Sequence, residues 1–243
     1  RTESARDLML AVDLSGSMSQ RDMLDADGNR QTRMDAVKEV LDDFISRREG
    51  DRLGIIVFGT QAFVQTPFTR DHELVRALLD QVQPRMPGPQ TMIGDAIGLT
   101  IRAFESSEAR DRVLVLLTDG ADTGSRVPPQ RAAEMAAGEG IIIHTVTMGD
   151  AESTGAGRID LAAMEAVASE TGGSAFSAGR REELARIYDE IDLLTPEEIE
   201  TVTYRPTTPL FHWPLGAAVS LVLLYHGTML MVAGAKELGA RHA

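Results

Sequence analysis

The chain of 243 residues carries 37 Asp and Glu against 24 Lys and Arg, which gives a formal net charge of −13, and it contains no cysteine. This acidic balance excludes a basic nucleic-acid-binding protein, and the lack of thiols excludes disulfides, thiolate zinc sites and cysteine nucleophiles. A hydrophobic share of 43% with 25% charged residues is typical of a globular protein with a full core.

Short apolar runs alternate with helical patterns along residues 1–194, which we predict to form one domain. The first run, Leu8–Leu14, is almost wholly apolar, as expected of a strand that is buried on both faces. Apolar residues at helical spacing follow over Thr32–Arg48. Further strands are predicted at 53–58, 113–118, 141–148 and 174–177, a hairpin or edge strand at 62–68, and helices at 71–82, 94–104, 129–137, 161–170 and 182–194. The alternation predicts an α/β fold, a doubly wound, mainly parallel sheet with helices on both faces.

Residues 213–235 differ from this domain in composition. Leu215–Ala235 is a run of 21 residues without a formal charge. As a helix it would span about 31 Å, which matches a bilayer core. Trp213 and Lys236 flank the run, where interfacial anchors are expected. We therefore expect a transmembrane helix at 213–235; the alternative is a buried core helix in which His226 is hydrogen-bonded.

The remaining boundaries follow from composition and charge. Residues 195–212 are rich in proline and threonine, which predicts an extended connector, and Thr201–Arg205 within it has the pattern of a strand. Residues 236–243 form a short basic tail. The charges after residue 205 sum to +1, which leaves a net charge of −14 on residues 1–205.

Polar side chains gather where the predicted strands end. Asp13, Ser15 and Ser17 alternate at the end of the first strand, so all three can point to one place. Asp119 ends another strand, and a proline-rich loop brings Gln90 and Thr91 directly before a helix. Ligands of doubly wound sheets bind at the carboxyl ends of the strands. Because carboxylate and hydroxyl oxygens without His or Cys suit a hard cation, we predict a site for Mg²⁺ or Mn²⁺ where these segments meet.

Each of these pieces also has a simpler explanation. The Asp13 motif fits a helix N-cap turn, and Asp119-Gly120 fits a plain turn.

Asp25–Asn29 is similar to the start of a calcium loop, but Arg30 stands where that loop needs glycine, which favours a polar turn. The loops at 19–31 and 122–127 flank the predicted site, and we expect them to determine partner selectivity.

Together, the segments DLSGSMS, the QT of GPQTMIGDAIG, and LLTDG resemble the metal-ion-dependent adhesion site (MIDAS) of von Willebrand factor A (VWA) domains. The resemblance covers residues 7–194. It implies that Ser15, Ser17 and Thr91 supply hydroxyl ligands, while Asp13 and Asp119 act largely through waters. Mostly neutral ligands leave the metal under-neutralised, so the resemblance implies a protein partner whose carboxylate completes the octahedron.

Longer runs resemble the bacterial aerotolerance-operon (BatA-type) membrane proteins, which are encoded near MoxR-type AAA+ ATPases: RLGIIVFGTQAFVQTPFT, TMIGDAIGL, LLTDGADTGS and TGGSAFSA. This resemblance implies a place in the bacterial inner membrane. It also implies partners among other VWA membrane proteins and a MoxR-type ATPase. The basic tail favours a periplasmic domain, whereas a cytoplasmic ATPase partner favours the opposite face.

Two functions from different classes fit these residues. The first is a membrane-anchored module without enzymatic activity, which binds a protein partner through the metal within a MoxR/Bat-like complex for envelope or stress-related protein assembly. The second is a Mg²⁺-dependent hydrolase or phosphotransferase that uses Asp13. Phosphoryl transfer needs a cationic side chain for the transferred group, and the nearest loops offer only Arg21 and Arg85, neither at a strand end. The sequence therefore favours the binding module.

Overall fold

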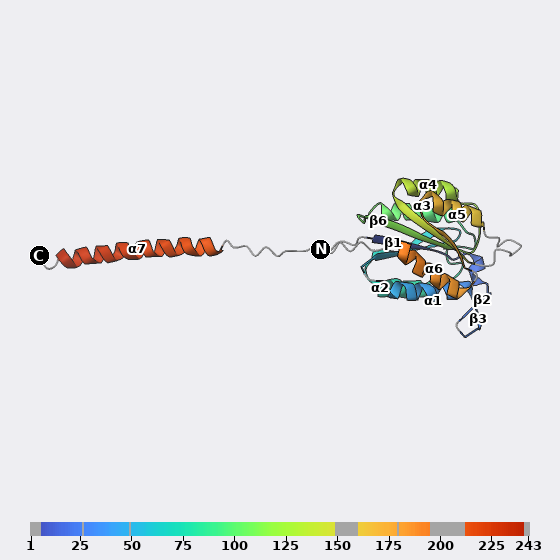
Figure 1. The fold of residues 1–243 in the computed structure, drawn as a ribbon, viewed down its shortest axis with the longest axis horizontal. Coiled ribbons are helices and arrows are strands. Elements are labelled where there is room, and N and C mark those ends of the chain that lie inside the picture. The colour runs from blue at the N-terminus through green and yellow to red at the C-terminus, as the bar shows by residue number, and fades with distance from the viewer. Residues whose placement is uncertain are drawn as a thin grey trace. The chain divides into compact units, whose positions relative to one another are not determined.

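The structure, a computed structural model, describes residues 6–25, 27–48, 50–148, 160–178, 180–194 and 212–240 (Figure 1). The chain divides into two compact units, Arg1–Glu200 and Thr201–Ala243. The predicted metal-binding residues all lie in the first unit.

Among the described residues, a six-stranded sheet forms the centre of the first unit, in the order β5-β4-β1-β6-β7-β8. Its strands are β1 (Arg6–Asp13), β4 (Arg52–Phe58), β5 (Ala62–Thr69), β6 (Asp111–Thr118), β7 (Ile141–Met148) and β8 (Ala175–Ala178). Neighbouring strands are parallel except β4 and β5, which pair antiparallel at one edge. The predicted α/β fold with a mainly parallel sheet is therefore confirmed, and so is the hairpin at residues 62–68.

Of the helices described in this unit, three cover each face of the sheet (Figure 1). One face carries α1 (Arg33–Ser46), α2 (His72–Gln81) and α6 (Arg181–Leu194), and the other carries α3 (Ile93–Phe104), α4 (Pro129–Gly138) and α5 (Leu161–Glu170). Strand β1 supplies both cores, because successive side chains point to opposite faces. Leu8, Leu10 and Val12 pack toward α1, whereas Met9 and Ala11 pack toward α3. Burial on both faces explains why this strand is a continuous apolar run.

Between β1 and α1 lie small elements that the sequence pattern did not predict. A 3₁₀ turn, Gly16–Ser19, is followed by a two-stranded antiparallel pair, β2 (Met23–Leu24) and β3 (Arg30–Gln31). Strands of two residues are too short to show a period. In the turn between them, Asp25 Oδ1 accepts the backbone N–H groups of Asp27 and Asn29 at 2.9 and 2.8 Å. This is the local bonding of a polar Asx turn.

Local capping fixes where α1 and α2 begin. Thr32 accepts the N–H of Asp35 at 3.0 Å, and the Asp35 carboxylate accepts the N–H of Thr32 at 3.4 Å, which is a capping box. Asp71 caps α2 by accepting the N–H of Leu74 at 3.0 Å, as its position before the helix predicts. The first cap matters for the site, because it orients the first turn of α1.

The second unit contains α7 (His212–Ala240), whose described side chains, from Trp213 to Met229, are exposed. The helix continues past residue 235 into the predicted tail, because Lys, Glu, Leu and Ala at 236–240 favour a helix. In the described part of the chain, no helix is long and apolar enough to cross a membrane, so the transmembrane helix expected at 213–235 is not found. The connector was expected at residues 195–212, of which 195–211 lie outside the described residues. The strand expected at 201–205 lies wholly within that part.

Candidate metal centre

The two motif carboxylates meet where the strand order reverses. From β1 the chain runs to β4 on one side and later to β6 on the other, so this switch point lies between β1 and β6. Asp13 is the last residue of β1, and Asp119 follows Thr118, the last residue of β6. The parallel register pairs Val12 with Leu117. This register brings both carboxylates to the same edge of the sheet.

Asp13 is completely buried, and each of its oxygens accepts a hydrogen bond. Oδ1 accepts the backbone N–H of Ser15 at 2.7 Å, and Oδ2 accepts the Thr118 hydroxyl at 2.6 Å. Burial, and after it the charge of Asp119, raises the pKa of Asp13 to about 7. A cation beside this carboxylate would favour its ionised form.

The two motif serines lie between the carboxylates. The hydroxyl oxygens of Ser15 and Ser17 are 3.0 Å apart, and the Ser17 hydroxyl donates to Asp119 Oδ1 at 2.6 Å. Asp119 is also completely buried, and this burial raises its pKa. The structure thus brings Asp13, Ser15, Ser17 and Asp119 together, as the alternation of the motif predicts.

This set of oxygens fits the predicted Mg²⁺ or Mn²⁺, because hard cations prefer carboxylate and hydroxyl ligands. Two carboxylates buried side by side also repel each other, and a divalent cation would relieve that repulsion. In the described residues, no group of three or more His, Cys, Asp or Glu side chains could hold a metal ion. Binding at this edge would therefore depend on the hydroxyl groups as well as on the carboxylates.

Thr91 reaches the same edge from the loop before α3. Its Oγ1 lies 3.6 Å from the position that a Cβ would take on Gly120, the residue after Asp119. Its backbone is fixed by Thr123, whose Oγ1 accepts the Thr91 N–H at 3.0 Å and whose N–H donates to the Thr91 carbonyl at 2.9 Å. Within the described contacts, no hydrogen bond joins the Thr91 hydroxyl to the other four predicted ligands.

The loop at 122–127 holds the start of α3 in place. Asp122 Oδ1 accepts the N–H of Ile93 at 2.8 Å, and Asp122 Oδ2 accepts the N–H of Ser125 at 3.0 Å. Ser125 Oγ in turn accepts the N–H of Gly94 at 2.9 Å. The loop that we expected to determine selectivity therefore caps the helix behind Thr91. This cap joins segments 29 to 31 residues apart in the chain, so local pattern does not reveal it.

Gly94 allows this loop to approach α3 closely, and its replacement gives a test. A Cβ on Gly94 would lie 1.9 Å from the carbonyl oxygen of Val127. We expect Gly94→Ala to displace the loop, to lower the midpoint of thermal unfolding and to weaken metal binding through Thr91. Gly98→Ala is the matched control on the same helix, because its Cβ would meet nothing within 4 Å.

The control should stabilise the domain by up to about 1 kcal/mol, since alanine favours a helix more than glycine does. Thermal denaturation and Mn²⁺ titration of the two variants make the comparison. If Gly94→Ala were as stable as Gly98→Ala, the close approach of the loop would not hold Thr91 in place.

Arg33, a buried arginine that the sequence pattern did not single out, also belongs to the centre. It is the first residue of α1, and its side chain is 6% exposed. It donates from Nη1 to Asp119 Oδ2 at 2.9 Å and from Nε to Asp22 Oδ1 at 3.0 Å. The hydrogen bond from Arg33 to Asp22 lowers the pKa of Asp22 below its usual range. An arginine at a helix N-terminus opposes the helix dipole, and this unusual position is the signal that could have revealed it.

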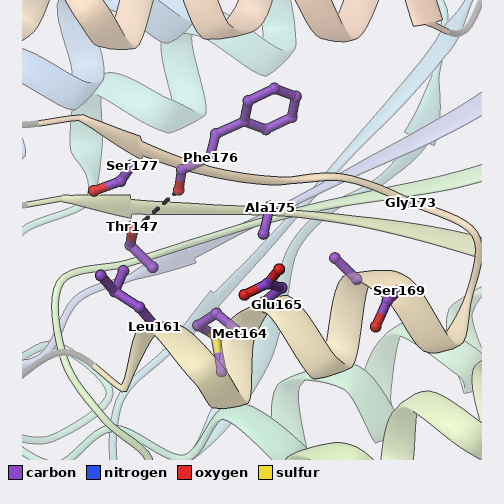
Figure 2. Close-up of a pocket in the computed structure, with 10 residues that line it drawn as sticks. Thr147, Leu161, Met164, Glu165, Ser169, Gly173, Ala175, Phe176 and Ser177 are labelled. Carbon is purple, nitrogen blue, oxygen red and sulfur yellow. Dashed lines mark hydrogen bonds between the residues drawn. The ribbon is translucent and has the colours of Figure 1, made fainter.

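A separate cavity of about 400 Å³ lies between strands β7 and β8 and helix α5 (Figure 2). Figure 2 shows Glu165 projecting from α5 toward Ala175, and Thr147 donating its hydroxyl to the carbonyl oxygen of Phe176 at 3.0 Å. None of the five predicted metal ligands is among the residues that line this cavity. It is therefore a different site from the candidate metal centre.

Part of the chain matches the model of a known protein family. Residues 8–121 match the model of the von Willebrand factor type A domain, and this stretch includes all five predicted ligands. The chain is 26% identical over 247 residues to a UPF0353 protein of Mycolicibacterium paratuberculosis, with 92% of this chain and 69% of that protein covered. It is 27% identical over 146 residues to an uncharacterized protein of Borreliella burgdorferi. That match covers 60% of this chain and 41% of the Borreliella protein, so the chain spans less than half of that relative's length.

Solved structures share the fold at low sequence identity. BatB from Bacteroides thetaiotaomicron superposes with a TM-score of 0.66 at 24% identity, covering 77% of this chain and 98% of that one. An aerotolerance-related membrane protein from Bacteroides fragilis gives 0.65 at 24% identity, covering 78% and 99%. Proximal thread matrix protein 1 of the mussel byssus, in a structure with a zinc-occupied MIDAS motif, gives 0.62 at 20% identity, covering 78% and 45%.

Proposed function

Because residues 8–121 match the model of the von Willebrand factor type A domain, we propose that this chain is a module without enzymatic activity that binds a protein partner through a Mg²⁺-type metal. The observation that carries the proposal is the meeting of Asp13, Ser15, Ser17 and Asp119 at the switch point of the sheet. Two buried carboxylates with raised pKa values, bridged by hydroxyls, favour a divalent cation between them.

Each residue has a separate role in this proposal. The hydroxyls of Ser15, Ser17 and Thr91 bind the metal directly, and the carboxylates of Asp13 and Asp119 hold it largely through waters. Neutral direct ligands leave much of the positive charge for a carboxylate of the partner. The bound metal supplies that charge and an open ligand position.

The charge of the domain explains why the metal is needed for an acidic partner. Residues 1–205 carry −14, which repels acidic groups at long range. A cation at the edge of the sheet reverses this repulsion locally, within a Debye length of about 8–10 Å at ordinary salt. Of the two loops expected to determine selectivity, the β2–β3 segment remains available to the partner, because the 122–127 loop is engaged with α3.

We also propose that the domain works at a bacterial membrane, within a complex that contains other VWA membrane proteins and a MoxR-type ATPase. Support comes from the fold neighbour called an aerotolerance-related membrane protein. Helix α7 adds a second point, because it exposes apolar side chains that need an apolar environment, among them Trp213, Leu221 and Leu224. Carbonate extraction of native membranes tests this location, and release of the full chain into the soluble fraction would contradict it.

Partner capture tests the role of the metal. We expect the wild-type chain to recover partners from native membranes in Mg²⁺, and to lose them in EDTA. Thr91→Ala should recover several-fold less, and its metal-free form should unfold at the wild-type midpoint, because the hydroxyl of this loop residue contributes little to the core. Equal recovery in all three samples would show that the metal has no part in binding. Mg²⁺-dependent hydrolysis of a phosphate ester would instead support the hydrolase alternative.

A further inference from the structure

Arg85 adopts a backbone conformation that L residues rarely take. Its φ is +71°, and among the described residues it is the one non-glycine residue with a positive φ. Two hydrogen bonds hold it there: its N–H donates to the carbonyl of Leu14 at 2.6 Å, and its carbonyl accepts the N–H of Gly88 at 3.0 Å. Strained residues of this kind persist where the surrounding structure holds them, often at functional sites.

This conformation brings the arginine against the metal-binding loop. A Cβ built on Gly16 would lie 3.4 Å from Arg85 Nε and 3.6 Å from Nη2. Gly16 stands between Ser15 and Ser17, two of the three proposed hydroxyl ligands. A second bond ties the loops together, since the N–H of Gly16 donates to the carbonyl of Pro89 at 3.1 Å. The guanidinium therefore lies next to the predicted metal position.

The charge of Arg85 has no partner within the described part of the chain, where neither an ion pair nor a side-chain hydrogen bond involves it. Arg33, the other arginine of this edge, is held by Asp22 and Asp119. An exposed cation without an acidic partner, in a strongly acidic domain and beside the metal loop, can pair with an incoming group.

We infer that Arg85 determines specificity by pairing with a second acidic side chain of the docked segment, next to the carboxylate that reaches the metal. The inference rests on the proposed function. The planar guanidinium can bind a carboxylate through two parallel hydrogen bonds. The metal binds any single carboxylate, so the arginine adds selection for a segment that carries a second one. The partner segment therefore carries two neighbouring acidic residues.

Two synthetic peptides test this inference on the full chain. One contains an Asp-Asp pair, and the other is identical except for Asp-Asn. With Mn²⁺ present, the wild type should bind the first peptide about three- to tenfold more tightly, a range expected of a partly exposed ion pair. Arg85→Gln should bind both peptides equally and should bind Mn²⁺ as the wild type does. Arg102→Gln, which removes the same charge from the exposed face of α3, should keep the preference.

A second variant separates function from folding. Arg85→Gly should lose the preference while unfolding at a higher temperature than the wild type, because glycine adopts positive φ without strain. A preference that survives in Arg85→Gln would overturn the inference, and so would metal-dependent binding of both peptides with equal affinity by the wild type. If the wild type bound neither peptide in Mn²⁺, the proposed function itself would fail with it.

Discussion

Replacing Asp13 with asparagine is expected to abolish Mg²⁺ and Mn²⁺ binding and, at the same time, to stabilise the metal-free domain at pH 8. The loss of binding should be at least about 100-fold, because the remaining carboxylate and hydroxyls lack the charge that attracts a divalent cation. The gain in stability follows from removing one of two buried carboxylates that repel each other. Asparagine still offers an oxygen to the N–H of Ser15, so the turn after β1 should persist.

The pH dependence gives the sign of this effect. The pKa of Asp13 is raised from 3.8 to about 7 in the folded domain, so between these values the folded state holds a proton that the unfolded state has released. The contribution of this group to stability is therefore complete below about pH 4 and is lost as the pH rises through about 7. Asp13→Asn should remove that loss of stability. The free energy of unfolding of the metal-free variant should therefore exceed that of the wild type most clearly above pH 7.

A matched control stands on the same strand. Asp7 is equally buried at the other end of β1, but it is bonded to Arg52 at 2.7 Å. Asp7→Asn weakens an ion pair whose carboxylate is buried and whose arginine is 33% exposed, and it should cost about 1–3 kcal/mol. Chemical denaturation in EDTA at several pH values compares the two variants. If Asp13→Asn were less stable than the wild type at pH 8, the Asp13 carboxylate would stabilise the metal-free fold. That result would contradict the inference that the two buried carboxylates repel each other until a metal binds.

Replacing Arg33 with glutamine is expected to destabilise the metal-free domain by about 3 kcal/mol, since it leaves the buried carboxylate of Asp119 without its cation. The same change should increase the affinity for Mg²⁺ and Mn²⁺ by about tenfold, because one positive charge no longer competes at Asp119. Saturating metal should therefore restore much of the lost stability.

The surface pair of Arg76 and Asp42 supplies the control for Arg33. Both side chains are well exposed, so Arg76→Gln should cost less than about 1 kcal/mol and leave metal affinity unchanged. Denaturation with and without Mn²⁺, together with direct titration, measures both effects. Unchanged affinity in Arg33→Gln would mean that its bond to Asp119 does not oppose the metal.

The strands and helices of the domain could be predicted because burial on one or two faces imposes a period on the sequence. The meeting of Asp13 and Asp119 could be predicted for a related reason, since parallel strands place their carboxyl ends at one edge. Arg33 escaped prediction because its partners, Asp22 and Asp119, lie 11 and 86 residues away, and no local period encodes such contacts. The cap that Asp122 gives to α3 escaped for the same reason.

The wide spacing of the motif residues has a kinetic consequence. Ser17 and Asp119, which touch through a hydrogen bond, are 102 residues apart in the chain. They meet only after β6 has paired with β1, on the side of β1 that is opposite β4. Closing so long a loop costs chain entropy before the contact can form. We therefore expect the site to be incomplete in the folding transition state, so that a bound cation slows unfolding and leaves the folding rate nearly unchanged.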